Sequence, residues 1–275
     1  LQMLYFPAKQ EDIQQGRKRL AFEELFEMLL AAEMNKRENM KLDGWLIPFD
    51  QPTVKAFVDS LPFPLTNAQR RVAWQILQDF EKSTPMNRLL QGDVGSGKTV
   101  VAGLVARQAA QSGLQTALLA PTEILASQHA KTLADLLEPQ GVSVALLTGS
   151  VKPAARKGLL DALANGEIDI IIGTHALLQD SVSFHKLGLV IIDEQHRFGV
   201  KQRQALMDKS PKMPHLLSMT ATPIPRSLAL TLYGELDISI LDELPAGRQP
   251  ITTKLWSPAS TPAMYELVDR EISSG

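Results

Sequence analysis

Eight consecutive residues have the types and spacing of a phosphate-binding loop. They fit the pattern G-x-x-x-x-G-K-[ST] and read Gly92, Asp93, Val94, Gly95, Ser96, Gly97, Lys98 and Thr99. Glycines let the backbone curl so that successive N–H groups point at a phosphate, and Lys98 can reach the β- and γ-phosphates. The Thr99 hydroxyl is placed to bind Mg²⁺. The loop therefore predicts a nucleoside triphosphate site, with a strand at residues 87–90 before it and a helix at residues 100–106 after it.

An acidic pair follows the aliphatic residues 189–192 and supplies a second chemical signal. Four aliphatic residues in a row favour a central parallel strand that is covered on both faces. Asp193, at the carboxyl end of this strand, is placed to hold Mg²⁺ directly or through water. Glu194 is placed to orient and deprotonate an attacking water. The alternative is a strand that ends in a solvated acidic turn, but the phosphate loop upstream favours metal-dependent hydrolysis.

Composition limits the classes of protein to which the chain can belong. Its 275 residues can form one large domain or two modest ones, and they include no cysteine, which excludes disulfides and thiolate metal clusters. No apolar run approaches the roughly twenty residues of a membrane span, so we expect no membrane partner and a cytoplasmic location. The formal net charge is −2, so any contact with DNA must depend on local groups.

The remaining elements predict the fold class. A helix that Thr66 caps is expected to run to about residue 82. Beyond it, helices alternate with buried aliphatic strands at residues 116–120, 143–147, 169–172, 188–193, 215–219 and 238–241. This alternation predicts an α/β fold with a doubly wound parallel sheet. Each short polar motif follows a strand, and ligands bind at the carboxyl ends of the strands in such sheets.

Three regions are expected along the chain. Residues 1–60 are predicted to be a helical linker, with an apolar stripe on a helix at residues 10–41 and a proline-rich loop at residues 45–64. Residues 61–244 form the α/β lobe. Residues 245–275 are expected to be a linker and the truncated start of another domain, with a strand at residues 252–256 and a helix at residues 263–272. The chain is therefore expected to be a fragment.

Several linked motifs are together more specific than any of them alone. They occupy residues 63–70, 92–99, 120–123, 173–175, 193–199 and 219–226. The most specific are the acidic box D-E-Q-H with R-F-G after it, and the run T-A-T-P-I-P-R. With these motifs, residues 61–246 resemble superfamily 2 helicases, and most closely the RecG family of bacterial ATP-dependent DNA helicases. The resemblance implies a RecA-like P-loop NTPase lobe.

The same resemblance implies roles at the nucleotide site. Gln69 is expected to read adenine by paired hydrogen bonds, with Phe63 packing nearby, which makes ATP with Mg²⁺ the expected cofactor. The alternative for Gln69 is an ordinary polar residue of a helix. Lys98, Glu194 and His196 are the expected catalytic residues. His196 is also expected to link the γ-phosphate site to Thr220 and Thr222, a pair that couples hydrolysis to movement of the lobes.

Other strand-end motifs resemble those that hold the phosphates of a single strand through backbone N–H and hydroxyl groups. The expected DNA-binding or coupling residues are Pro121, Thr122, Thr148, Gly149, Gly173, Thr174, His175, Arg197 and Phe198. Plain turn chemistry is the alternative for any one of these motifs, and a functional role for His175 is left open. Arg197 and Phe198 are expected to clamp either DNA or a neighbouring domain. His129, His185 and His215 are interpreted as structural residues.

The family also implies partners. A second RecA-like lobe would supply an arginine finger, and an N-terminal wedge domain of the same full-length chain would recognise forks and junctions. The expected function is that of a helicase motor lobe for fork reversal and Holliday junction branch migration in DNA recombination and repair, in the bacterial cytoplasm. The alternatives are a duplex DNA translocase of the transcription–repair coupling type and an ATP-binding switch without mechanical work.

Overall fold

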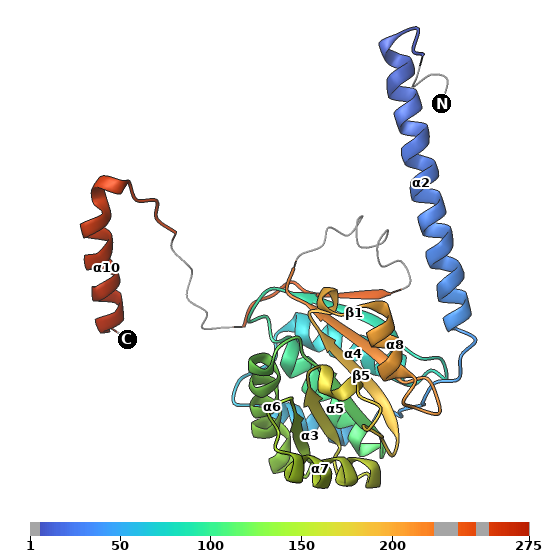
Figure 1. Cartoon of the computed structure of the whole chain (residues 1–275), viewed down its shortest axis with the longest axis vertical. Helices are drawn as coiled ribbons and strands as arrows, with labels where there is room; N and C mark the ends of the chain where they lie inside the picture. Colours follow the sequence, from blue (N-terminus) through green and yellow to red (C-terminus); the bar gives the residue numbers. More distant parts are fainter. Residues whose placement is uncertain (1–5, 223–235, 246–252, 275) are drawn as a thin grey trace. The chain divides into compact units, whose positions relative to one another are not determined.

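A computed structural model describes residues 6–222, 236–245 and 253–274 of the chain (Figure 1). The chain divides into two compact units, Leu1–Pro245 and Ala246–Gly275. In the chain, the two units meet between residues 245 and 246, next to the place where the turn-rich sequence predicted a boundary.

The first unit is built on a sheet of seven parallel strands (Figure 1). The strand order is β3-β4-β2-β5-β6-β1-β7. The strands are β1 Asn87–Gly92, β2 Gln115–Leu119, β3 Val144–Leu147, β4 Ile170–Gly173, β5 Leu187–Asp193, β6 His215–Thr220 and β7 Asp237–Leu241. The predicted α/β fold with a parallel sheet is therefore confirmed, and all predicted strands of the lobe are present to within a few residues.

Helices cover both faces of this sheet, as the aliphatic strands require. Alternate residues of one strand point to opposite faces, so Leu118 and Ile191 join one apolar cluster while Leu119 and Ile192 join the other. The first cluster includes α4, α5 and α6, and the second includes α7 and α8. The α-helices in the described part of this unit are α2 Gln10–Asn39, α3 Gln51–Ser60, α4 Asn67–Phe80, α5 Lys98–Gln111, α6 Glu123–Leu137, α7 Pro153–Asn165 and α8 Val200–Met207. Thr66 caps α4, as predicted.

The long helix α2 confirms the helical prediction for the start of the chain but not the predicted apolar stripe. Seven large apolar residues lie between positions 20 and 30, and that is more than one face of a helix can hold. They are distributed around α2 and remain largely exposed, as for Phe22 and Phe26, which stack with ring centroids 6.0 Å apart.

The prolines in residues 45–64 suggested a loop and a domain edge; residues 45–50 and 61–64 do lack regular structure, but the prediction is wrong for residues 51–60, which form α3. Pro52 lies in the first turn of α3, where a missing N–H costs nothing. Phe57 of α3 and Ile47 before it are fully buried in the first apolar cluster. The Ile47 N–H also donates to the Phe80 carbonyl at 2.9 Å. The core of the lobe therefore begins before residue 61, and the linker is shorter than the sequence suggested.

The second unit contains the predicted C-terminal helix, which is α10 Thr261–Ser274, preceded by the short helix η4 Pro258–Ser260. The predicted strand at residues 252–256 is wrong for residues 253–256, which have no regular structure. Residue 252 lies outside the described residues. A strand is stable only when it pairs within a sheet, and the described part of this unit contains no other strand. No helix in the described ranges is long and apolar enough to cross a membrane.

His215 at the start of β6 gives the lobe a pH-dependent stability. Its Nδ1 accepts from the Met86 N–H at 3.0 Å, so its Nε2 donates to the Trp45 carbonyl at 2.6 Å and the ring is neutral. Burial lowers the pKa of His215 to about 4, with the Trp45 hydrogen bond and Asp79 opposing the shift. The unfolded chain, with a pKa of about 6.5, binds this proton more readily. The stabilisation is therefore complete above pH 6.5 and is lost as pH falls towards 4.

We predict that the free energy of unfolding falls by about 2 kcal/mol between pH 7 and pH 5 through this group alone. Urea unfolding at both pH values measures the loss. The variant His215→Asn keeps an acceptor near Met86 but cannot take up the proton. It should be less stable than the parent at pH 7 and should lose less stability on acidification. An equal loss in both proteins would contradict the assignment.

Candidate functional site

The predicted phosphate loop joins a strand to a helix, as its pattern requires. β1 ends at Gly92, and α5 begins at Lys98. Gly95 and Gly97 have φ angles of 78° and 89°, in the left-handed region that favours glycine. A Cβ on Gly97 would also overlap the amide nitrogen of Gln69. The loop is therefore held in a conformation that side chains at these positions would prevent.

Lys98 folds over this loop from the first turn of α5. Its Nζ donates to the carbonyls of Gly92 at 2.7 Å and Asp93 at 3.0 Å. Burial lowers the pKa of Lys98, and the nearby carboxylates of Asp193, Glu194 and Asp93 oppose that shift. An ammonium group that is partly desolvated and held by carbonyls is well placed to exchange them for phosphate oxygens.

Ser96 provides a test of whether the loop fits a phosphate. Its side chain is fully buried, and its Oγ has no hydrogen-bond partner within the described part of the chain. A buried hydroxyl without a partner is costly and rare in folded proteins. Because this hydroxyl lies in the loop with the Lys98 ammonium, the residues present fit an anionic ligand there.

The acidic pair lies at the end of β5, next to the phosphate loop. Asp193 is the last residue of the strand, and its Oδ1 accepts from the Glu194 N–H at 3.1 Å. Glu194 has a φ of 49° and is the one residue other than glycine with positive φ among those described. Such a conformation costs on the order of 1–3 kcal/mol and is concentrated at functional sites.

One carboxylate oxygen of Glu194 makes no hydrogen bond among the described residues. Its Oε2 is buried and has no hydrogen-bond partner among the described residues, although the His196 Nδ1 lies 3.5 Å away. A carboxylate oxygen in this state can accept a proton from a water that enters the site. The strained backbone and the oxygen without a hydrogen bond together support the predicted role of a general base.

His129, which the sequence analysis interpreted as a structural residue, contacts one of the predicted metal ligands. It lies on α6, and its Nε2 donates to the Asp193 Oδ2 at 2.8 Å. Its Nδ1 lies 3.5 Å from the Thr99 Oγ1. The sequence did contain a sign of this contact, namely a histidine on the apolar face of a helix. His129 falls on the same face of α6 as the buried residues Ala126 and Leu133. A histidine on an otherwise apolar face needs a polar partner, and the sequence could not identify that partner.

Thr99 and Asp193, the predicted magnesium ligands, are therefore both neighbours of one imidazole ring. The described residues hold no cluster of three or more His, Cys, Asp or Glu side chains that could bind a metal by themselves. Mg²⁺ is usually bound by one or two carboxylates together with substrate phosphates and water. The donor set fits a metal that arrives with a nucleotide.

Gln69 has a structural role in this conformation. Its Oε1 accepts from the Thr66 N–H at 2.9 Å, and its Nε2 donates to the Ser96 carbonyl at 2.8 Å. Each end of the amide therefore has one protein partner, and its second lone pair and second N–H are the groups with which it could read adenine. Adenine recognition by Gln69 remains a prediction. Phe63 is 42% exposed, so its ring is available for a base to pack against.

A cavity at the carboxyl edge of the sheet brings two of the predicted catalytic residues together with several of the predicted DNA-binding and coupling residues. Its lining consists of Pro121, Thr122, Leu125, His175, Glu194, His196, Arg197 and Thr222. The Thr222 hydroxyl lies 2.8 Å from that of Thr220, within the predicted coupling motif. Residues 223–226 of that motif lie outside the described residues. This cavity therefore contains residues predicted for ATP hydrolysis and residues predicted to contact a DNA strand.

Other predicted DNA-binding residues have structural roles here and do not line this cavity. Thr148 is 2% exposed, and its hydroxyl is bonded to that of Ser150 at 2.8 Å. Gly173 lies against the Leu147 carbonyl, which a Cβ would overlap. Phe198 is 5% exposed and packs in the second apolar cluster, where its ring lies 5.4 Å from that of His175. Phe198 therefore supports His175 and offers no surface for a clamp. Gly149 and Thr174 remain predictions.

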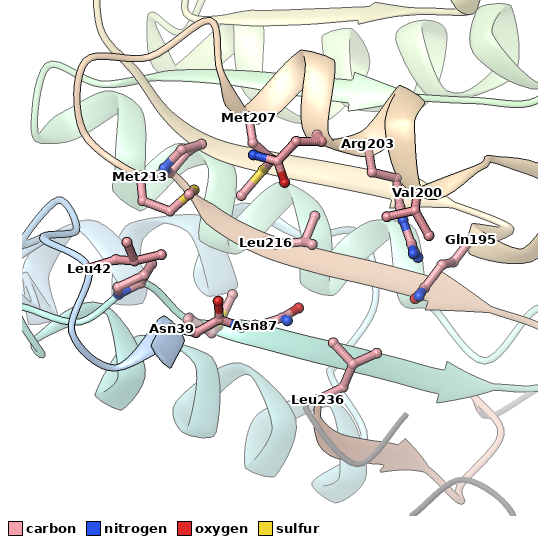
Figure 2. Close-up of a pocket in the computed structure, with 14 residues that line it drawn as sticks. Asn39, Leu42, Asn87, Gln195, Val200, Arg203, Met207, Met213, Leu216 and Leu236 are labelled. Carbon is pink, nitrogen blue, oxygen red and sulfur yellow. The ribbon is translucent and has the colours of Figure 1, made fainter. Parts of the chain in front are cut away.

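A second cavity lies on the sheet face that α8 partly covers (Figure 2). Figure 2 shows Asn87 of β1 and Leu216 of β6 on one side of it and Arg203 and Met207 of α8 on the other. No residue of the phosphate loop lines it. Gln195 lines this cavity and directly follows Glu194, the predicted general base, in the chain.

Comparisons with known proteins support the same interpretation. A model of the DEAD/DEAH box helicase family matches residues 66–231. The ATP-dependent DNA helicase RecG of Aquifex aeolicus is 49% identical over 259 residues, which cover 94% of this chain and 33% of that protein. RecG of Bacillus subtilis is 50% identical over 277 residues, covering 100% of this chain and 40% of that protein. The chain thus spans less than half the length of these relatives.

The solved structures agree with this result. A structure of RecG bound to a three-way DNA junction is 45% identical, with a TM-score of 0.86, and covers 96% of this chain and 36% of that one. The helicase MrfA bound to DNA and AMPPNP, at 20% identity and a TM-score of 0.59, shares the fold. The family match covers more than half of the chain and includes both the phosphate loop and the acidic box. The chain therefore belongs to the DEAD/DEAH box helicase family, and it is similar over almost its whole length to RecG helicases.

Proposed function

We propose that this chain is the first motor lobe of an ATP-dependent DNA helicase that acts on branched DNA in recombination and repair. The observation that carries the proposal is the edge cavity, in which Glu194 and His196 lie with Pro121, Thr122, His175, Arg197 and Thr222. An ATPase without mechanical work has no need to place strand-binding groups beside its general base. The similarity to RecG, including a RecG bound to a three-way junction, supports branched DNA as the substrate.

The proposed hydrolysis follows from the residues at the phosphate loop. Lys98 exchanges its two carbonyl partners for β- and γ-phosphate oxygens, while the loop N–H groups hold the β-phosphate. Thr99 and Asp193 would hold Mg²⁺, which when bound would neutralise charge on the phosphate oxygens. Glu194 takes a proton from water, the water oxygen bonds to the γ-phosphorus, and the bond from that phosphorus to the ADP oxygen breaks.

The link to DNA runs through the groups that line the edge cavity. Thr122 caps α6 by accepting from the Leu125 N–H at 3.3 Å, so its backbone marks a helix N-terminus that favours a phosphate. Arg197 is exposed and can pair with a second phosphate. We propose that Thr220 and Thr222 transmit the state of the nucleotide to a second lobe of the full-length protein. That lobe would supply the arginine finger, which is worth on the order of a thousandfold or more in turnover.

Two alternatives predict different responses to DNA. A translocase of the coupling type would act on plain duplex, and a nucleotide switch would not respond to DNA at all. The similar structure of RecG bound to a three-way DNA junction favours branched DNA. The two relatives named above come from bacteria, which supports a bacterial origin of this chain, and we propose the cytoplasm as its location.

The test is the ATPase rate of the full-length protein alone and with a model fork, a linear duplex or a single strand. We expect the fork to stimulate turnover more than the other two DNAs do. The variant Glu194→Gln serves as a control for contaminating ATPases and should remain inactive with every DNA. Equal stimulation by fork and duplex would replace the proposal with the coupling-type translocase, and the absence of any response would replace it with the switch.

A further inference from the structure

We infer that His129 is a positioning residue for the metal ligands, and that it fixes Asp193 in the orientation that Mg²⁺ binding requires. This inference rests on the proposed ATP–Mg²⁺ site. The inferred role begins with a contact between two nearly buried groups. The His129 and Asp193 side chains are 11% and 10% exposed, and the distance from Nε2 to Oδ2 is 2.8 Å.

The direction of this hydrogen bond follows from the chemistry of the partners. An ionised carboxylate only accepts, so the proton lies on the Nε2 of His129. The Asp193 Oδ1 accepts from the Glu194 N–H at 3.1 Å. Both oxygens are thus held by donors on different elements, and the carboxylate cannot rotate without breaking one of the two bonds. Each oxygen retains a free lone-pair direction for a metal or for water bound to it.

The second ring nitrogen extends the contact to the phosphate loop. With the proton on Nε2, the Nδ1 is an acceptor, and it faces the Thr99 Oγ1 at 3.5 Å, the outer limit of a hydrogen bond. A threonine hydroxyl that gives its lone pair to a metal still carries a proton that needs an acceptor. His129 therefore lies between the two predicted ligands and can hold both through one rigid ring.

The position of the ring is itself fixed by close packing of two helices. A Cβ on Gly103 of α5 would lie 3.0 Å from the Leu133 side chain of α6. The two helices can approach this closely because position 103 is a glycine. His129 is one turn before Leu133, so the packing holds its ring against the first turn of α5, where Thr99 lies.

The same helix reaches the edge cavity. α6 begins beside Thr122, which lines that cavity, and His129 lies about 10 Å further along the helix axis. A ligand that moves the N-terminus of α6 would therefore also move the ring that holds Asp193. Helix α6 therefore connects the predicted metal ligand Asp193, through His129, with Thr122, a predicted DNA contact.

The experiment measures the binding of a fluorescent ADP analogue to the full-length protein during a Mg²⁺ titration, and again in EDTA. We expect His129→Ala to raise the Mg²⁺ concentration that gives half of the maximal increase in nucleotide binding by about tenfold to a hundredfold. Loss of a residue that orients a metal ligand typically weakens metal binding by this factor. Binding in EDTA should not change, because the loop itself is intact. His129→Gln keeps an amide N–H near the position of the Nε2. The Mg²⁺ concentration that it needs for half-maximal nucleotide binding should therefore be within about threefold of the parent value.

The controls separate this inference from the proposed function. His185→Ala removes an exposed histidine from outside the site and should behave like the parent protein. A normal Mg²⁺ response in His129→Ala would overturn the inference, as would an equal loss of nucleotide binding in EDTA. Failure of His129→Gln to restore the response would also overturn it. If the parent protein itself binds no nucleotide in a Mg²⁺-dependent way, the proposed function fails first.

Discussion

Replacing Lys98 with alanine is expected to remove most nucleotide binding and nearly all ATP turnover from the full-length protein. The ammonium group lies where the β- and γ-phosphates are predicted, and it now bonds to the Gly92 and Asp93 carbonyls. Loss of a charged hydrogen bond costs about 1.5–3 kcal/mol in binding, or roughly tenfold to a hundredfold in affinity. Loss of a group that stabilises developing charge lowers turnover by a further factor of about 10²–10³.

The measurements are the affinity for an ATP analogue by calorimetry and the steady-state ATPase rate. Lys157→Ala, which removes an exposed lysine on α7, provides a matched control and should leave both unchanged. The fold should survive in Lys98→Ala, because Lys98 is only half-buried and its partners are carbonyls at the surface of the loop. Unchanged turnover in Lys98→Ala would contradict the assignment of the phosphate loop.

Glu194→Gln should separate binding from hydrolysis. The amide has almost the same shape as the carboxylate but cannot accept the proton of an attacking water. Positioned general bases contribute about 10²–10⁴-fold to a rate, so we expect ATP turnover to fall by that factor while ATP binding is retained. The Oε2 of Glu194 makes no hydrogen bond within the described part of the chain, so the substitution loses no protein hydrogen bond at that atom.

A single-turnover experiment with radiolabelled ATP distinguishes loss of chemistry from loss of binding. Glu138→Gln, on an exposed 3₁₀ turn (η1, Glu138–Gln140), is the matched control and should behave like the parent. If Glu194→Gln binds ATP as poorly as Lys98→Ala does, the strained backbone at Glu194 serves to hold the loop together, and the general base lies elsewhere.

The sequence by itself determined the sheet and the two ends of the nucleotide site. Aliphatic strands of four to seven residues alternate with helices, and such strands can be stable only when both faces are covered. The phosphate loop and the acidic pair were predictable because their chemistry needs residues adjacent in the chain. Gly92 to Thr99 are expected to wrap one phosphate, and Asp193 and Glu194 lie together at one strand end.

Predictions from short stretches of sequence were wrong where tertiary packing determines the structure. Pro52 suggested a loop, but it occupies a helix N-terminus, and the burial of Phe57 stabilises α3 against the lobe. Seven apolar residues in α2 suggested one stripe, but their number places them on several faces. Phe198 follows the acidic box in the sequence, yet burial makes it part of the core.

Only the tertiary structure could show the contacts between residues distant in the chain. His129 and Asp193 are 64 positions apart, and nothing local to His129 specifies a carboxylate partner. Gln69 could be an adenine reader or a support for the loop, and its bond to the Ser96 carbonyl identifies the second role in this conformation. A parallel sheet brings the carboxyl ends of its strands to one edge, whatever their separation in sequence. The sequence therefore determines which groups end each strand, whereas the order of the strands decides which of those groups meet.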